Sequence, residues 1–135
     1  YSNYASILKD LGNYEEDKKS LYKAVKSDEK NFGTEHPSTA TSYSNYALVL
    51  KDLGNYEEAK QYLYKAVKSA EKNFGTEHPT TAIRYSNYAT VLKDLGNYEE
   101  AKDYSRKAYQ IMLKSLGENH PNTIIVKEIL DSFNK

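Results

Sequence analysis

A repeat of 42 residues is the feature of this sequence that most restricts its fold. Two strings, YSNYA and KDLGNYEE, each occur three times at that step, at residues 1–5, 43–47 and 85–89 and at residues 9–16, 51–58 and 93–100. Residues 1–42 and 43–84 differ at only nine positions. Self-similarity at such a period is typical of architectures in which each unit buries its apolar face against its neighbours. The chain is therefore expected to form a stack of equivalent units.

The first half of each unit has the apolar spacing of an amphipathic helix, here named helix A. In unit one the apolar residues fall at i, i+3, i+4, i+7 and i+10, namely Tyr1, Tyr4, Ala5, Leu8 and Leu11. This is one face of a helix with 3.6 residues per turn. Gly12 and Asn13 follow, and glycine is common just past a helix end because it adopts left-handed backbone angles without strain. We expect helix A of unit one to end at this pair.

The second half of each unit predicts another helix, named helix B. In unit two its apolar stripe is Tyr56, Ala59, Leu63, Ala66, Val67, Ala70 and Phe74. Glu57 and Glu58 in its first turn and Lys72 near its end suit the helix dipole. Gly75 is expected to end helix B, and Pro79 to begin the next helix A, where the missing N–H removes no hydrogen bond.

These patterns divide the chain into one all-α domain of three units and a cap. The expected units are residues 1–42, 43–84 and 85–121, and the capping helix is residues 122–135. The last segment has one apolar stripe, formed by Val126, Ile129, Leu130 and Phe133, with polar residues on its other side. Terminal units of such stacks need a polar outer face.

Unit one departs from unit two along one stripe of helix B. Asp17, Ser20 and Asp28 stand where unit two has Ala59, Tyr62 and Ala70. These differences are either neutral drift at tolerant positions or the mark of a stripe that faces solvent. We favour the second interpretation, because burying an unpaired carboxylate is costly.

The units resemble tetratricopeptide repeats. The residues that carry the resemblance are Gly54, Tyr56, Ala59 and Ala66 around the turn and helix B, with Tyr43 at the start and Pro79 at the end of a unit. The 42-residue length, the SNYA start of helix A and the G-x-x-H-P loop are similar to the kinesin light chain type. The resemblance implies a right-handed superhelical solenoid with helix A on its concave side. It also implies a scaffold that binds proteins or peptides.

Two positions depart from related patterns. Ala47 stands where a glycine is common at the crossing of helices A and B. Ser6, Leu48 and Thr90 stand where the chaperone type, which binds a C-terminal carboxylate, has an asparagine. The resemblance therefore disfavours recognition of a peptide C-terminus.

The candidate binding surface is the face of helix A opposite its apolar stripe. Its residues are Asn3, Asn45, Asn87, Ser44, Ser86, Leu48, Thr90, Lys51, Lys93, Asp52 and Asp94. A carboxamide both donates and accepts hydrogen bonds, so the asparagines can pair with a peptide backbone whatever its side chains. The resemblance assigns them this role, and the alternative is that they are solvated or connect units. The lysines and aspartates are more simply a solvated face, while Leu48 with Ile83 could form an apolar pocket or pack between units.

Composition excludes other classes of function. The chain has 19 basic and 19 acidic residues, interspersed, and lacks the basic stripe that nucleic acids select. It has no cysteine for a thiolate metal site and no apolar run that could span a membrane. His36, His78 and His120 recur one per unit, so they are expected to serve the loops rather than share a metal. No catalytic or nucleotide-binding motif is present, so we expect no enzyme activity and no cofactor. The compartment stays open, with the cytoplasm favoured.

Two functions remain. The leading hypothesis is a scaffold that binds a peptide segment on the concave face of helix A. The alternative is a structural array that associates with itself through its open N-terminal face, since near-identical units can stack between molecules.

Overall fold

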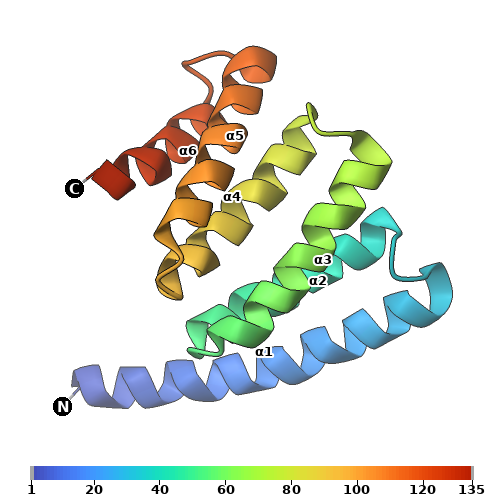
Figure 1. Ribbon diagram of the computed structural model, residues 1–135. Coiled ribbons are helices and arrows are strands. Elements are labelled where there is room, and N and C mark those ends of the chain that lie inside the picture. The colour runs from blue at the N-terminus through green and yellow to red at the C-terminus, as the bar shows by residue number, and fades with distance from the viewer. Residues whose placement is uncertain (1, 135) are drawn as a thin grey trace.

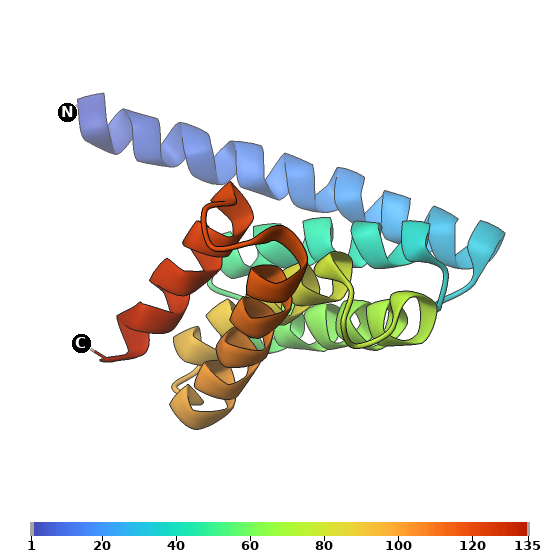
Figure 2. The same ribbon diagram turned by 90° about the horizontal axis from the view of Figure 1, so that it is seen from above.

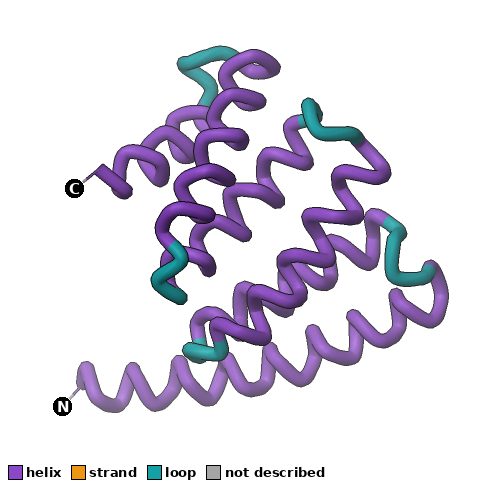
Figure 3. Tube along the Cα trace, in the orientation of Figure 1, coloured by secondary structure: helices purple, strands orange, loops and turns teal. Residues whose placement is uncertain are grey.

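The chain forms a solenoid of antiparallel helices, which confirms the predicted fold class. The computed structural model describes the backbone of residues 2–134 and the side chains of residues 12–133. The helices are α1 (Ser2–Phe32), α2 (Pro37–Asp52), α3 (Tyr56–Phe74), α4 (Pro79–Asp94), α5 (Tyr98–Leu116) and α6 (Pro121–Asp131), followed by a 3-10 turn, η1 (Ser132–Asn134). Each helix packs against the next along the chain (Figure 1). Only short loops and turns connect the helices (Figure 3).

Contacts between helices that are not consecutive show which layer is on the inside of the curve. Helix α2 also contacts α4, and α4 also contacts α6. Helices α3 and α5, which lie between them in the sequence, make no comparable contact with each other. The helix A equivalents α2, α4 and α6 therefore form the inner, more crowded layer, as the resemblance implied.

The inner helices begin in the same way because each follows a His-Pro pair. Pro37, Pro79 and Pro121 each occupy the first turn, where their fixed backbone angle suits the helix. The preceding histidine is the N-cap in each case, and its Nδ1 accepts a hydrogen bond from the backbone N–H two residues later, at 3.0–3.1 Å. The expectation that the histidines serve these loops is confirmed.

Glycine ends helices in the two regular hairpins. Gly54 has a φ of 85° and Gly96 a φ of 84°, which residues with a side chain rarely adopt. Gly54 N–H donates to the Lys51 carbonyl at 2.9 Å, so an orphan carbonyl at the end of α2 is satisfied. The predicted turn between helices A and B is thus present in units two and three.

The core lies between the two layers and follows the predicted stripes. Tyr43, Leu50 and Leu92 on inner helices and Leu63 and Val67 on α3 are almost fully buried. Phe74 is the exception on the helix B stripe, because it is 41% exposed and stacks on His78 with 4.9 Å between ring centroids. Burying a large apolar side chain contributes about 1.5–3 kcal/mol, so these layers hold the stack together.

The predicted turn at Gly12–Asn13 is wrong. Helix α1 runs without a break from Ser2 to Phe32, and its N-terminal half projects past α2 in both views (Figures 1 and 2). Residues 2–32 of unit one therefore form one uninterrupted helix and not a hairpin. The apolar stripe predicted from Tyr1 to Leu11 lies among residues whose side chains are not described.

Asp17 gives a physical reason for the straight helix. The octapeptide KDLGNYEE is the same at residues 9–16, 51–58 and 93–100, so local preference cannot explain why only the first copy is helical throughout. Ala59 and Ala101, the counterparts of Asp17, are 0% exposed inside their hairpins, whereas Asp17 is exposed. Closing the first hairpin would bury this carboxylate, which costs several kcal/mol unless it is paired.

Neighbouring residues on the same stripe are also less buried in unit one than in unit two. Leu21 and Ala24 are only half-buried, while their counterparts Leu63 and Ala66 are buried. Ser20 is exposed, as expected for a stripe that faces solvent. Asp28 instead accepts a hydrogen bond from the Ser42 hydroxyl on α2. The polar stripe of unit one is therefore open to solvent at Asp17 and Ser20 and engaged with α2 at Asp28.

Helix α6 occupies the place of a fourth helix A. Val126 is buried against the stack, and Ile129, Leu130 and Phe133 are half-buried, as the predicted apolar stripe requires. Lys127 and Asp131 are exposed where α4 has the buried Tyr85 and Ala89. The outer side of α6 is thus more polar than that of α4.

Candidate peptide-binding surface

The inner layer presents one stripe of side chains from each of its helices, here called the inner face. Residues at i, i+4, i+7 and i+11 share a side of a helix. The stripes are Thr41, Asn45, Leu48 and Asp52 on α2, Ile83, Asn87, Thr90 and Asp94 on α4, and Ile125, Ile129 and Ser132 at the C-terminal end. Because α2 contacts α4 and α4 contacts α6, these equivalent stripes lie side by side.

The two described asparagines lie at the open surface. Asn45 is exposed and Asn87 is half-buried. No hydrogen bond of either carboxamide occurs among the described residues. Asn3 belongs to the projecting part of α1, whose side chains are not described. The carboxamides of Asn45 and Asn87 are therefore available to a ligand, and their role in binding stays a prediction.

The predicted serines and Leu48 differ in exposure. Ser44 is 3% and Ser86 8% exposed, so both lie beneath the surface rather than on it. Leu48 is 38% exposed, and Thr90 donates its hydroxyl to the Asn87 backbone carbonyl at 2.7 Å. Leu48 is the one apolar side chain among the predicted binding residues.

The charged residues mainly connect neighbouring elements. Lys51 on α2 lies 3.7 Å from Asp94 on α4. Lys93 donates to the Ser132 hydroxyl at 3.0 Å and lies 5.1 Å from the centre of the Phe133 ring. Asp52 is exposed. A solvent-accessible ion pair such as Lys51–Asp94 contributes roughly 0–1 kcal/mol, so it adds little to the stability of the fold.

A hollow of about 240 Å³ lies on the inner face between α4 and α6. Its apolar lining includes Ile83, Met112, Ile125 and Ile129, and Asn87 lies at its edge with other polar residues. Ile83 is 41% and Ile125 53% exposed. Leu48 does not line this hollow, so it is not the pocket predicted between Leu48 and Ile83; the hollow beside Ile83 lies toward α6 instead.

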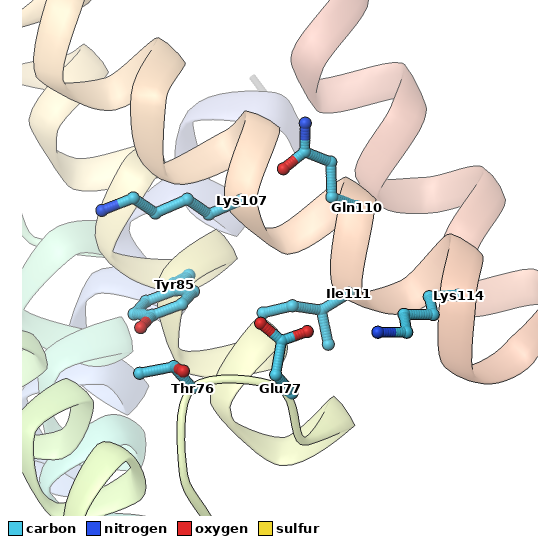
Figure 4. A pocket seen from close by; sticks show the side chains of 7 residues that line it. All are labelled: Thr76, Glu77, Tyr85, Lys107, Gln110, Ile111 and Lys114. Atoms are coloured by element: carbon cyan, nitrogen blue, oxygen red, sulfur yellow. The ribbon is translucent and has the colours of Figure 1, made fainter.

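A second hollow, of about 310 Å³, lies where the loop before α4 meets α5 (Figure 4). The Tyr85 ring and the Glu77 carboxylate lie in it with the side chains of Lys107, Ile111 and Lys114 from α5. An equivalent hollow recurs one unit earlier, between the loop before α2 and helix α3. There Lys72 pairs with Glu35, and Ser69 donates to the Glu35 backbone carbonyl at 3.0 Å. Because the hollow recurs and this ion pair and hydrogen bond connect the loop to helix B, both hollows are interpreted as a result of packing between units.

Arg84 is a residue of the inner layer that the sequence did not single out. It extends from α4 toward α2, where Nη1 donates to the Ser44 hydroxyl at 2.9 Å and Nη2 to the Thr41 hydroxyl at 3.2 Å. The only signal in the sequence was that this position differs in every copy, with Ser42 and Val126 as its counterparts.

The described residues provide no metal site or membrane span. No group of three or more histidines and carboxylates that could hold a metal ion occurs in the described part of the chain. None of the described helices is both long and apolar enough to cross a bilayer.

Comparison with known proteins agrees with the repeat pattern. A model of the tetratricopeptide repeat family matches residues 1–72, 40–114 and 80–128. No curated protein sequence matches the chain.

Solved structures share the fold. One is from Podosopora anserina and is described as a kinesin light chain with nearly identical TPR-like repeats. It has 24% identity and a TM-score of 0.85, over 97% of this chain and 62% of that one. BtubC (BKLC) from P. vanneervenii has 20% identity and a TM-score of 0.74, over 97% of this chain and 55% of that one. The chain therefore spans less than two thirds of these structures.

Proposed function

Because the chain belongs to the tetratricopeptide repeat family, whose repeats are generally scaffolds for protein–protein interaction, we propose that it binds an extended peptide along its inner face. No catalytic reaction is proposed for the chain. The protein would hold the peptide across α2, α4 and α6.

The observation that carries the proposal is the pair of carboxamides at Asn45 and Asn87. They occupy equivalent places on adjacent inner helices and make no hydrogen bond with the described residues. An extended peptide presents an alternating series of N–H and C=O groups, and a carboxamide can pair with both. The exposed side chains of Leu48, Ile83 and Ile125 beside them would bury apolar side chains of the same peptide.

The test is the double variant Asn45→Ala/Asn87→Ala, measured against a peptide selected from a random library on the parent protein. Each lost hydrogen bond contributes about 0.5–1.5 kcal/mol, so the double change should raise Kd about tenfold or more. Fluorescence anisotropy gives Kd, and circular dichroism checks that helicity is unchanged.

A matched control removes two exposed amides from the outer layer. The variant Gln61→Ala/Gln110→Ala changes one residue on each of α3 and α5, both exposed. It should bind the peptide as the parent does. Equal binding by the asparagine double variant would refute the proposed site.

Self-association is the second candidate, favoured by the straight helix α1. The N-terminal half of α1 projects from its own stack and could pack against a second copy (Figure 2). Sedimentation equilibrium separates the two functions, since a peptide-binding scaffold is expected to stay monomeric at concentrations where an array associates.

A further inference from the structure

The two hollows beside the loops before α2 and α4 have nearly the same volume, about 300 and 310 Å³. Packing between units explains why a hollow recurs, because the same loop meets the same part of helix B in both units. It does not explain why the two hollows differ in chemistry. The polar groups of the earlier hollow are engaged with one another, and those of the later hollow are not.

In the earlier hollow, helix α3 satisfies the polar groups of Glu35. Ser69 donates its hydroxyl to the Glu35 backbone carbonyl at 3.0 Å, and the Asn73 carboxamide donates to the same carbonyl at 2.7 Å. Lys72 pairs with the Glu35 carboxylate. The carbonyl and the carboxylate of the loop thus both have partners within the chain.

The equivalent groups of the later hollow lack these partners. Ile111 and Ser115 occupy the positions of the two donors on α5, and isoleucine has no donor to offer. Among the described residues, neither the backbone carbonyl nor the carboxylate of Glu77 takes part in a hydrogen bond or ion pair, and Lys107 and Lys114 make no ion pair. These two lysines extend from α5 on either side of the Glu77 carboxylate (Figure 4).

The later hollow is also open and positively charged. Glu77, Lys107 and Lys114 are exposed, while the Tyr85 ring below them is only 3% exposed. Two ammonium groups and one carboxylate line the hollow, so positive charge is in excess by one. No acidic residue of α5 follows Asp103, so this end of the helix supplies no further carboxylate. An incoming carboxylate would complement this charge.

We propose that this hollow is a second binding site, which takes an acidic segment of a partner protein. Carboxylates of the segment pair with Lys107 and Lys114. A backbone N–H of the segment donates to the Glu77 carbonyl, as Ser69 and Asn73 do to the equivalent carbonyl in the earlier hollow. The site lies on α5, in the outer layer, so this segment and a peptide on the inner face can bind at the same time. The inference is independent of the function proposed for the inner face.

The first test selects a random 12-residue phage library on Asn45→Ala/Asn87→Ala, in which the inner face is impaired. The selected peptides should be enriched in aspartate and glutamate. A synthetic peptide with the commonest selected sequence should shift the amide NMR signals of α5 and of the loop before α4. Peptides without acidic enrichment, or shifts confined to the inner helices, would overturn the site.

The second test changes the charge of the hollow in both directions. Lys107→Gln should raise the Kd of the same peptide up to about fivefold, the range of an exposed ion pair. Glu77→Gln should lower Kd, because it removes the competing carboxylate. Lys65→Gln makes the equivalent change in the earlier hollow and is the matched control, with no change in Kd expected. Equal losses for Lys107→Gln and Lys65→Gln would contradict a site in the later hollow.

The third test exchanges the side chains that distinguish the two hollows. Ile111→Ser/Ser115→Asn gives α5 the donors of α3, so the Glu77 carbonyl should become engaged and binding should be lost. The reverse change, Ser69→Ile/Asn73→Ser, should raise the stoichiometry measured by isothermal titration calorimetry from one peptide per chain to two. Thermal unfolding checks that both variants fold. A stoichiometry of one in the parent and in both variants would show that the peptide binds elsewhere.

Discussion

Histidines 36, 78 and 120 cap three helices with a side chain rarely used for this purpose. Nδ1 is the acceptor in each cap, so the ring proton must be on Nε2. The rings of His36 and His78 also stack on Phe32 and Phe74, with centroids 4.7 and 4.9 Å apart. One residue thus satisfies an orphan N–H of the first turn and covers the end of the preceding helix.

Replacing His78 by alanine should destabilise the protein by about 0.5–2 kcal/mol, the usual cost of losing an N-cap. The N–H of Thr80 then loses its acceptor, and the Phe74 ring loses its stacking partner. Urea unfolding followed by circular dichroism measures the change. His78→Asn keeps a capping acceptor and is the control. If His78→Ala and the parent unfold at the same urea concentration, the cap does not contribute to stability.

At the scale of the helices, the same octapeptide adopts two conformations. KDLGNYEE forms a turn at residues 51–58 and 93–100 and a continuous helix at residues 9–16. Gly54 and Gly96 have positive φ, and Gly12 does not. The choice between hairpin and straight helix therefore depends on residues outside the octapeptide, of which Asp17 is the one that a closed hairpin would bury.

Restoring the unit-two stripe should close the first hairpin. The triple variant Asp17→Ala/Ser20→Tyr/Asp28→Ala removes both carboxylates and restores the tyrosine that packs against the inner helix in unit two. Because the chain has no cysteine, spin labels can be attached at Ser6→Cys and Leu48→Cys, equivalent positions in units one and two. Pulsed electron resonance should report a shorter distance in the triple variant than in the parent sequence. An unchanged distance would show that this stripe does not hold α1 straight.

At the scale of the whole molecule, contacts between tyrosine rings, some buried and some at the surface, connect successive helices. Tyr22, Tyr46 and Tyr62 link α1, α2 and α3, and Tyr88 and Tyr104 repeat part of this series between α4 and α5. Tyr43 and Tyr85 donate their hydroxyls to glutamates of the preceding helix B, at 2.7 and 2.6 Å. Burial raises the pKa of Tyr46 and of Tyr88 to about 12 and raises the pKa values of Tyr43 and Tyr85 further.

These shifts predict unfolding in alkali. A tyrosine has a pKa near 10 in the unfolded chain, so the folded state holds its phenol protons more tightly. The stability this provides is fully present below pH 10 and is lost as the pH rises from 10 through 12. Circular dichroism should show loss of helicity in this range, together with the rise in tyrosinate absorbance near 295 nm. Full ionisation of all tyrosines by pH 10.5 with helicity intact would contradict the prediction.

The sequence predicted those parts of the fold that depend on short-range signals. The ends of α2 to α5 follow from His-Pro and glycine positions that repeat every 42 residues. Helix α1 could not be predicted in this way, because its octapeptide is identical to two that turn and the decisive residue, Asp17, lies outside it. Of the predicted surface residues, Asn45 and Leu48 are exposed, Asn87 is half-buried, and Ser44 and Ser86 are buried. The repeat pattern did not point to Arg84, because the equivalent position has a different residue in each copy.

The exposed loops between helices B and A have a consequence for how such a chain can change in length. Each loop carries its own start and stop signals, from the positive-φ glycine to the His-Pro pair, and these lie outside the buried layers. Adding or deleting 42 residues at a loop would leave each remaining loop with its own start and stop signals. Recombination between near-identical coding segments could therefore vary the copy number, and with it the length of ligand that the inner layer spans.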